Sequence, residues 1–155
     1  MSNIKKSEKI RSILIGEWQL SRNISGNIYP MELLGRASFK NCGDYLFYRE
    51  EFKVPTPIGE ILNGTREYQY YFNNDQLAIY FSSMGVRGGL FLSLKLSTNN
   101  GINGTKGSGV HHCGSDRYDA EFNFLTYDNF KITYKVSGPK KDYTMITKYK
   151  REAGY

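Results

Sequence analysis

Apolar and polar residues alternate along most of this chain, in short runs that are separated by turn-forming residues. The clearest run covers residues 117–124, where Tyr118, Ala120, Phe122 and Phe124 alternate with charged or amide side chains. Such alternation is typical of an antiparallel strand with one buried face. Similar runs occupy residues 17–22, 46–52, 66–72, 77–81, 90–96, 130–136 and 143–150. The pattern predicts an all-β protein.

The runs and turns together predict about ten short strands with one helix before them. The helix is expected over Ser7–Leu14, with Ser7 as its cap and Ile10 and Ile13 on its apolar face. No helical pattern separates the strands, so a parallel sheet is not expected. Because meandering strands would leave open edges, we predict a closed antiparallel up-and-down β-barrel, with a sandwich as the second choice. A single domain over residues 1–155 is expected.

The chain has a net charge of +6, and its basic residues are concentrated towards the two ends. They are Lys5, Lys6, Lys9, Arg11, Lys140, Lys141, Lys148, Lys150 and Arg151. A surface for phosphates or an acidic protein is one interpretation. A solvated basic face is preferred, because no nucleic-acid-binding motif accompanies the charge. Nucleic acid is therefore not expected as a partner.

Cysteine content and hydropathy bear on the compartment. The two cysteines, Cys42 and Cys113, do not make a disulfide framework, and no apolar run of signal-peptide length follows the N-terminus. No stretch reaches the roughly 20 apolar residues of a membrane-spanning helix. We expect a cytoplasmic protein with free thiols and no membrane insertion, and the oligomeric state stays open.

The most reactive side chains lie in one predicted hairpin. If the two residues between Cys113 and Asp116 form its turn, these residues pair with each other and His111 pairs with Tyr118. A glycine at the first turn position, Gly114, suits a type II′ turn. Since directly opposed residues share a face, imidazole, thiol, carboxylate and phenol are predicted together on the apolar face of the hairpin.

This cluster admits several roles. It would anchor the polar end of a ligand, or His111, Asp116 and Tyr118 would exchange protons with a substrate. A structural network that fixes the barrel end is a further interpretation. A buried carboxylate needs a partner, and for Asp116 we expect His111 or Arg22. No metal site is predicted, because His111 and Cys113 supply two ligands where structural zinc takes about four. No cofactor is predicted, with haem bound by the histidine as the alternative.

Further polar side chains share the apolar face of their strands. They are Arg22, Tyr48, Glu50, Arg66, Tyr68 and Tyr70. We interpret them as ligand-binding residues inside the barrel, or as an internal ion pair between arginine and glutamate. The turn before the last strand places Lys141 and Tyr143 where they would guard the cavity mouth and attract an anionic ligand, or lie in solvent. A bulge would turn any of these side chains outward.

Gly16-Glu17-Trp18 opens the first strand after the short helix, and Arg151 ends the last strand. This arrangement resembles the calycin superfamily, which includes lipocalins and fatty-acid-binding proteins. The resemblance implies a barrel closed by a cation–π contact between Trp18 and Arg151, both with structural roles. The inward arginine and glutamate side chains resemble the head-group clamps of fatty-acid carriers.

A second resemblance covers nearly the whole chain. Its motifs are Gly16-x-Trp18-x-Leu20-x-Arg22, Tyr48-x-Glu50-Glu51, Tyr68-x-Tyr70-x-Phe72, His111-x-Cys113-x-x-Asp116-x-Tyr118, Val136-x-Gly138-Pro139-x-Lys141-Asp142-Tyr143 and Thr147-x-Tyr149-x-Arg151. In this order they resemble a family of stand-alone lipocalin-like domains without an assigned activity. That family commonly has His at the position of Leu92 and Gly at the position of Ala120, so a mechanism that needs the second His is not supported. The resemblance implies a barrel with a shared internal site.

The leading hypothesis is a binding protein for a small amphipathic ligand, with an acidic group as one option. Aromatic walls would hold its apolar body, and Arg22, Arg66, His111 and Tyr118 its polar end. One alternative is an isomerase, cyclase or hydrolase that acts on a small hydrophobic substrate with His111 and Asp116. The other is a module that binds a protein or nucleic acid through its basic surface. A binding protein is preferred over an enzyme.

Overall fold

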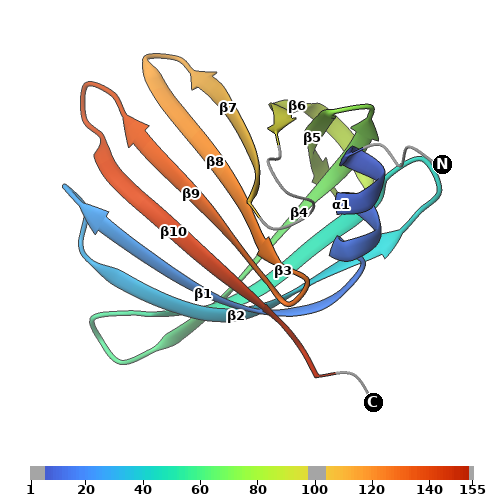
Figure 1. The fold of residues 1–155 in the computed structure, drawn as a ribbon. Coiled ribbons are helices and arrows are strands. Elements are labelled where there is room, and N and C mark those ends of the chain that lie inside the picture. Colours follow the sequence, from blue (N-terminus) through green and yellow to red (C-terminus); the bar gives the residue numbers. More distant parts are fainter. Residues whose placement is uncertain (1–5, 98–103, 154–155) are drawn as a thin grey trace, which may run out of the picture.

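The computed structural model describes residues 6–97 and 104–153, which form a closed barrel preceded by a helix (Figure 1). The elements are α1 (Lys6–Leu14), β1 (Gly16–Gly26), β2 (Met31–Asn41), β3 (Leu46–Pro55), β4 (Ile61–Asn73), β5 (Gln76–Ser83), β6 (Val86–Ser97), β7 (Thr105–Cys113), β8 (Asp116–Thr126), β9 (Asn129–Ser137) and β10 (Asp142–Arg151). Successive strands pair antiparallel, and β10 pairs with β1 to close the ring. The predicted all-β, up-and-down barrel with one short N-terminal helix is confirmed.

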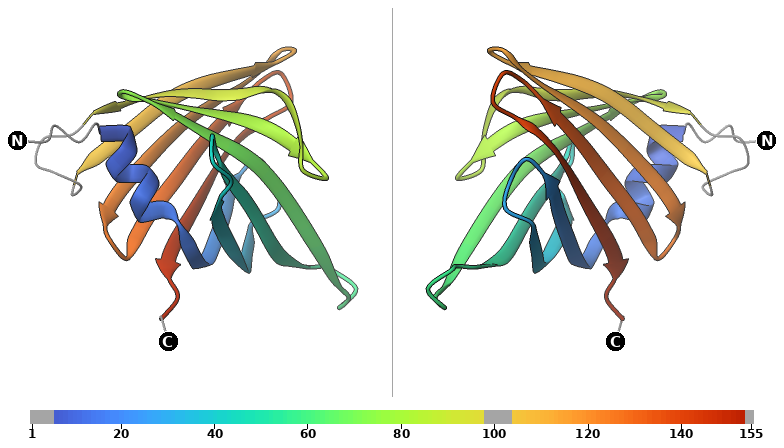
Figure 2. Two further views of the ribbon diagram at one scale, coloured as in Figure 1. Left: turned by 90° about the vertical axis from the view of Figure 1, so that its right-hand side faces the viewer. Right: turned by 90° about the vertical axis from the view of Figure 1, so that its left-hand side faces the viewer.

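The two ends of the barrel differ (Figure 2). α1 covers one end, while the hairpins β1–β2, β3–β4, β5–β6, β7–β8 and β9–β10 turn at the other. Ile10 and Leu14 bury the apolar face of α1 in the barrel core. Arg11 donates a hydrogen bond to Asn41 Oδ1 at 2.9 Å, and Trp18 Nε1 donates to Leu14 O at 2.9 Å. These contacts distinguish a covered end from a hairpin end.

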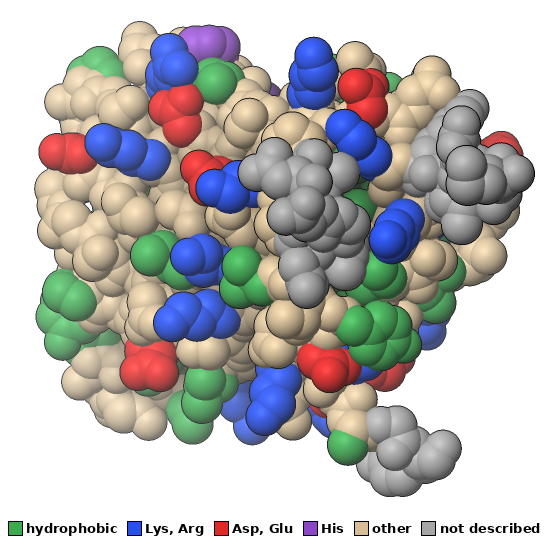
Figure 3. Space-filling view, in the orientation of Figure 1, with side chains coloured by type: hydrophobic (Ala, Val, Ile, Leu, Met, Phe, Trp, Pro, Cys, Tyr) green, Lys and Arg blue, Asp and Glu red, His purple; other side chains and the backbone are tan. Residues whose placement is uncertain are grey.

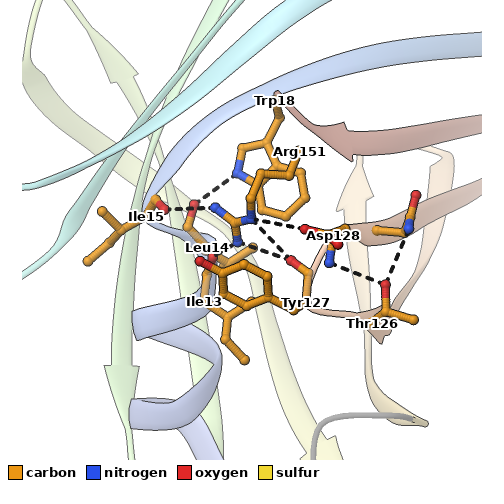
Figure 4. Close-up of polar contacts among 9 residues, drawn as sticks. Ile13, Leu14, Ile15, Trp18, Thr126, Tyr127, Asp128 and Arg151 are labelled. Atoms are coloured by element: carbon orange, nitrogen blue, oxygen red, sulfur yellow. Dashed lines mark hydrogen bonds and ion pairs between the residues drawn. The ribbon is translucent and has the colours of Figure 1, made fainter. Parts of the chain in front are cut away.

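Arg151 joins three parts of the chain at the covered end (Figure 4). Its guanidinium carbon lies 4.2 Å from the Trp18 ring centroid and 4.1 Å from the Tyr127 ring centroid. It also donates hydrogen bonds to the carbonyl oxygens of Ile13, Ile15 and Tyr127. The contact expected between Trp18 and Arg151 is therefore present. It ties the C-terminal end of α1 and the β8–β9 turn to the end of β10.

The core fills the covered half of the barrel with side chains that alternation predicts to point inward. Ala120, Phe122 and Phe124 of β8 are buried, and Phe130 of β9 stacks on Tyr149 of β10 with ring centroids 4.1 Å apart. Protein interiors of this kind are close-packed. Among the described residues, open space inside the barrel therefore lies towards the hairpin end.

Two local predictions are wrong. Ser7 is the second residue of α1 rather than its cap: its backbone N donates to Asn74 O, and its buried Oγ has no hydrogen-bond partner among the described residues. Alternation over residues 90–96 predicts Leu90 on the same buried face as Leu92, but Leu90 is 49% exposed. The cause is a register shift between β5 and β6, which turns Phe91 towards the core.

The basic residues near the two ends of the chain do not gather on one surface. Lys6 and Lys9 belong to α1 at the covered end, whereas Lys140 lies in the β9–β10 turn at the hairpin end. Lys148 is exposed on the outer wall of β10, and Lys5 lies outside the described residues. Figure 3 shows basic and acidic side chains interspersed on the face that it presents.

The cysteines were expected to be free thiols. Cys42 lies in the β2–β3 turn and Cys113 ends β7; both are free and exposed. No helix within residues 6–97 and 104–153 has the length and hydropathy of a membrane-spanning segment.

Candidate functional site

Arg22 and Glu50 form a bidentate ion pair inside the barrel. Arg22 Nη1 donates to Glu50 Oε2 at 2.7 Å and Nη2 donates to Oε1 at 3.0 Å, with both side chains at most 5% exposed. Arg22 Nε also donates to Thr147 Oγ1 at 2.8 Å. The Tyr48 hydroxyl donates to Glu50 Oε1 at 2.7 Å and lies 2.8 Å from the Tyr149 hydroxyl. Side chains from β1, β3 and β10 thus provide one another's hydrogen-bond partners inside the barrel.

The electrostatics of this network keep Arg22 ionised. Burial acts to lower the pKa of Arg22, but the hydrogen bond to Glu50 and the nearby charges outweigh it, so the pKa rises. Burial raises the pKa of Tyr48 and of Tyr149, so both phenols stay protonated near neutral pH. The Phe52 ring centroid lies 5.4 Å from the Arg22 guanidinium carbon. Phe52 is the next inward residue of β3 after Glu50, on the side of the hairpin end. The barrel therefore contains the internal ion pair that was one of the two interpretations of these residues.

A cavity of about 840 Å³ lies at the hairpin end. Aromatic rings form much of its wall, from Tyr68, Phe81, Phe91, Tyr118, Tyr134 and Tyr143. Tyr68 stacks on Phe91 with ring centroids 5.4 Å apart and planes inclined by 11°. Tyr134 stacks on Phe91 at 6.1 Å, and His111 meets the same ring edge-on at 5.0 Å. These rings make an aromatic surface suited to a flat or apolar ligand body.

Of the two arginines that line the cavity, Arg49 pairs with the Glu51 carboxylate, and the other is Arg66. It lies opposite Glu50 in the β3–β4 register, but the ion pairs among the described residues do not include it. Its side chain reaches solvent in the cavity, although protein atoms surround it closely. Burial acts to lower the pKa of Arg66, and nearby Tyr68 and Glu50 outweigh this effect and raise it. The guanidinium therefore stays charged and can bind a carboxylate or phosphate with two parallel hydrogen bonds.

Lys141 bridges two residues at the mouth of the cavity. Its Nζ lies 3.0 Å from Asp116 Oδ2 and donates to the Tyr118 hydroxyl at 3.1 Å. The hydrogen bonds to Tyr118 and to Asp116 raise the pKa of Lys141 above its usual value. Gly138 makes the arrangement possible, because a Cβ at that position would collide with the Asp116 carboxylate.

The hairpin that carries Asp116 has the predicted pairing. Cys113 lies opposite Asp116 and His111 lies opposite Tyr118, across a turn whose glycine has a φ of 62°. The predicted partner of Asp116, His111 or Arg22, is wrong. The β9–β10 turn brings a lysine to the carboxylate, Arg22 is held elsewhere in the barrel, and His111 contacts aromatic rings.

The sequence matches a model of a protein family, described as a family of unknown function, over residues 14–151. The chain belongs to the DUF6314 family. No curated protein matches it.

Two solved structures resemble this DUF6314 barrel. One is the S-type phycobiliprotein lyase CPES from Guillardia theta, with 8% identity and a TM-score of 0.68; the match covers 99% of this chain and 96% of that one. The other is a protein of unknown function from the DUF3598 family of Nostoc punctiforme, with 10% identity and a TM-score of 0.61. This second match covers 92% of the DUF6314 chain and 49% of that chain, so it spans about half of the larger protein. At these identities the likeness shows a shared fold.

The predicted site residues separate into groups within the DUF6314 barrel. Those that line the cavity are Arg66, Tyr68, His111, Cys113, Tyr118 and Tyr143. Those in the buried network are Arg22, Tyr48 and Glu50. Tyr70 lies in the core, where its ring meets Phe39 edge-on at 5.1 Å. Lys141 stands at the mouth in its ion pair with Asp116.

Several residues of the site were not among those predicted. Phe81, Phe91 and Tyr134 line the cavity, and Thr147 and Tyr149 complete the buried network. The alternation of inward and outward positions along the strands could have identified each of these residues except Phe91, because each of the others shares the inward face of its strand. For Phe91 the available signal was the pair of glycines before it, because glycine inside a strand often marks a bulge.

The cavity wall of the DUF6314 chain combines the guanidinium groups of Arg49 and Arg66, the Glu67 carboxylate, phenols, an imidazole and a thiol. The Asp116 carboxylate pairs with Lys141 instead of orienting His111. Among the described residues, no three His, Cys, Asp or Glu side chains are grouped closely enough to hold a metal ion.

Proposed function

We propose that this protein binds a small amphipathic molecule with an acidic group in the cavity at the hairpin end of a calycin-type barrel. The observation that carries the proposal is Arg66, a charged guanidinium that faces an aromatic cavity without an ion-pair partner among the described residues. The cavity volume of about 840 Å³ falls within the range of roughly 300–1,000 Å³ typical of small-molecule sites.

The charges inside the barrel support an anionic ligand. Arg22 and Arg66 are both ionised, and the one carboxylate near both of them, Glu50, is bonded to Arg22. An acidic group on Arg66 would balance the remaining positive charge. The Tyr68 hydroxyl lies beside the same guanidinium. The apolar body of the ligand would then lie against Phe91, with the imidazole of His111 as a further polar contact.

The alternative enzyme, with His111 and Asp116 as acid and base, has less support. In one common arrangement of such a pair, the carboxylate holds the imidazole in the orientation that proton transfer needs. Asp116 instead bonds to Lys141, and His111 is surrounded by Phe81, Phe91 and Tyr118.

Two fluorescent probes of similar shape test the proposal. Anilinonaphthalene sulfonate has an aromatic body and an acidic group, whereas phenylnaphthylamine has the aromatic body alone. We expect the wild type to bind both, and Arg66→Ala to lose about tenfold or more of its affinity for the sulfonate while it keeps the neutral probe. Arg117→Ala is the matched control, because Arg117 pairs with Asp119 outside the cavity at the same end.

The outcomes of this experiment are distinct. Equal loss of both probes in Arg66→Ala would mean that the variant has damaged the cavity, and unchanged binding of the sulfonate would remove Arg66 as the anion site. Native mass spectrometry of the purified wild type adds an independent check, since a retained acidic small molecule is the expected result.

A further inference from the structure

Three successive hairpins, β1–β2, β3–β4 and β5–β6, turn at the end of the barrel away from α1 (Figure 2), and each carries exposed apolar side chains at or near its tip. We call this set the apolar rim; it consists of Tyr29, Ile58, Ile61, Leu62, Met84 and Val86. Met84 is 93% exposed and Ile58 is 80% exposed. Single exposed apolar residues are common on soluble proteins. Here six of them lie on three successive hairpins at one end of the barrel, where they can contact the same apolar partner.

The tip of the β3–β4 hairpin holds Ile58 outward in a tightly bonded turn. Thr56 N and Thr56 Oγ1 both donate to Glu60 O at 2.9 Å, and Gly59 N donates to Thr56 O at 3.1 Å. Gly59 has a φ of 83°, which glycine adopts without steric cost. The exposure of Ile58 is therefore a fixed feature of the hairpin.

The tip of the β5–β6 hairpin presents Met84 at a position that does not suit it. Met84 has a φ of 51°, a left-handed conformation that favours glycine, asparagine or aspartate. Its backbone N and that of Gly85 each donate to the Glu67 carboxylate at 3.0 Å. Asparagine would suit this turn better. Since Met84 is nearly fully exposed, its apolar side chain adds little to the stability of the fold.

The charges around the apolar rim favour one kind of partner. The exposed charged residues at or near the tips of these hairpins are Glu32, Lys53, Glu60 and Arg87. Two are acidic and two are basic, so the rim has no excess charge to attract a polyanion or a strongly acidic protein. Headgroups of zwitterionic lipids carry both signs and complement such a surface. Side chains that project from separate hairpins can also insert between headgroups individually.

We infer that the apolar rim docks the barrel onto a bilayer of zwitterionic lipids. Met84 belongs both to the rim and to the cavity wall, so docking would turn the cavity mouth towards the membrane. An amphipathic ligand would then pass between bilayer and cavity without crossing water. The docking itself requires no ligand, and it can be tested on the empty protein.

Sedimentation with phosphatidylcholine vesicles tests the inference. We expect wild-type protein to sediment with the vesicles, with little change between low and high salt. The double variant Ile58→Asn/Met84→Asn should lose about tenfold or more in vesicle partitioning, because two aliphatic side chains leave the bilayer. The control is Leu125→Asn, since Leu125 is 47% exposed near the β8–β9 turn at the covered end. This control should partition as the wild type does.

Three results would overturn the inference. The wild type could stay in the supernatant, the control could lose as much partitioning as the double variant, or binding could require anionic lipid and vanish in salt. Analytical ultracentrifugation adds a fourth. If the wild type is a dimer, the double variant is a monomer and neither binds vesicles, the rim is an interface between two copies of the chain. Thermal melting verifies that the double variant folds. Arg66→Ala should bind vesicles as the wild type does, because Arg66 belongs to the proposed ligand site and not to the apolar rim. Docking and ligand binding can therefore fail independently.

Discussion

Arg66 lies directly opposite Glu50 in the register of β3 and β4, yet the Glu50 carboxylate bonds to Arg22. One carboxylate therefore interacts with two guanidinium groups, and its bidentate bond goes to the more deeply buried one, Arg22. The barrel interior is left with a positive charge on its cavity side. This arrangement links the stability of the fold to the chemistry of the site.

Removal of Glu50 should strongly destabilise the protein. Glu50→Ala leaves Arg22 buried without its carboxylate, and a loss of about 3–5 kcal/mol in the free energy of unfolding is expected. Urea unfolding measures it. The double variant Arg22→Met/Glu50→Leu removes both charges and should be the more stable of the two. A cost below about 1 kcal/mol for Glu50→Ala would contradict the buried pair.

Arg151 should not be replaceable by lysine. Arg151→Lys keeps the charge but loses the planar fork that reaches the carbonyl oxygens of Ile13, Ile15 and Tyr127. We expect a loss of about 2 kcal/mol, measured by thermal and urea unfolding. Lys150→Ala, on the exposed face next to it, should change stability by about 0.5 kcal/mol or less.

Glu67 should make stability depend on acid pH. Burial acts to raise its pKa, but hydrogen bonds from the Ser82 hydroxyl and the amides of Gly85 and Met84 outweigh it and lower the pKa below 4.5. The carboxylate therefore stabilises the fold above pH 4.5, and this contribution is lost as the pH falls through the lowered value. Unfolding free energies of Glu67→Gln should fall less steeply below pH 4.5 than those of the wild type. Parallel curves would refute the assignment.

Modification of Cys113 should block the cavity. Cys113 is exposed and lines the cavity mouth, whereas Cys42 is exposed in the β2–β3 turn at the covered end. A bulky maleimide on the single thiol of Cys42→Ser should reduce binding of anilinonaphthalene sulfonate. The same reagent on Cys113→Ser should leave binding unchanged. Equal effects of the two labels would argue against a ligand at this end.

Much of the fold follows from local patterns in the sequence. Alternation identified most strands, and the glycine between Cys113 and Asp116 set the register of that hairpin. β2 gave no clear run because two of its inward positions are Gly35 and Ala37, whose small side chains weaken the apolar signal. Alternation also gave the wrong face for Phe91, because the register shift between β5 and β6 leaves no mark in the pattern of apolar and polar residues.

The site was less predictable than the fold. Alternation along the strands placed Arg22 and Glu50 on inward faces. It does not determine whether the Glu50 carboxylate bonds to Arg22 or to Arg66. The choice depends on how β1 and β3 approach across the barrel interior. The partner of Asp116 was missed for a similar reason, because Lys141 comes from a turn that lies near Asp116 only after β9 and β10 have paired.

The closure by Arg151 also bears on how the protein is made. Arg151 bonds to the carbonyl oxygen of Ile15, 136 residues earlier in the chain, and β10 is the strand that completes the ring with β1. A ribosome delivers that strand last. Until then the nascent chain has two unpaired strand edges, which can pair with other chains. Premature termination before β10 should therefore yield aggregation rather than a smaller barrel.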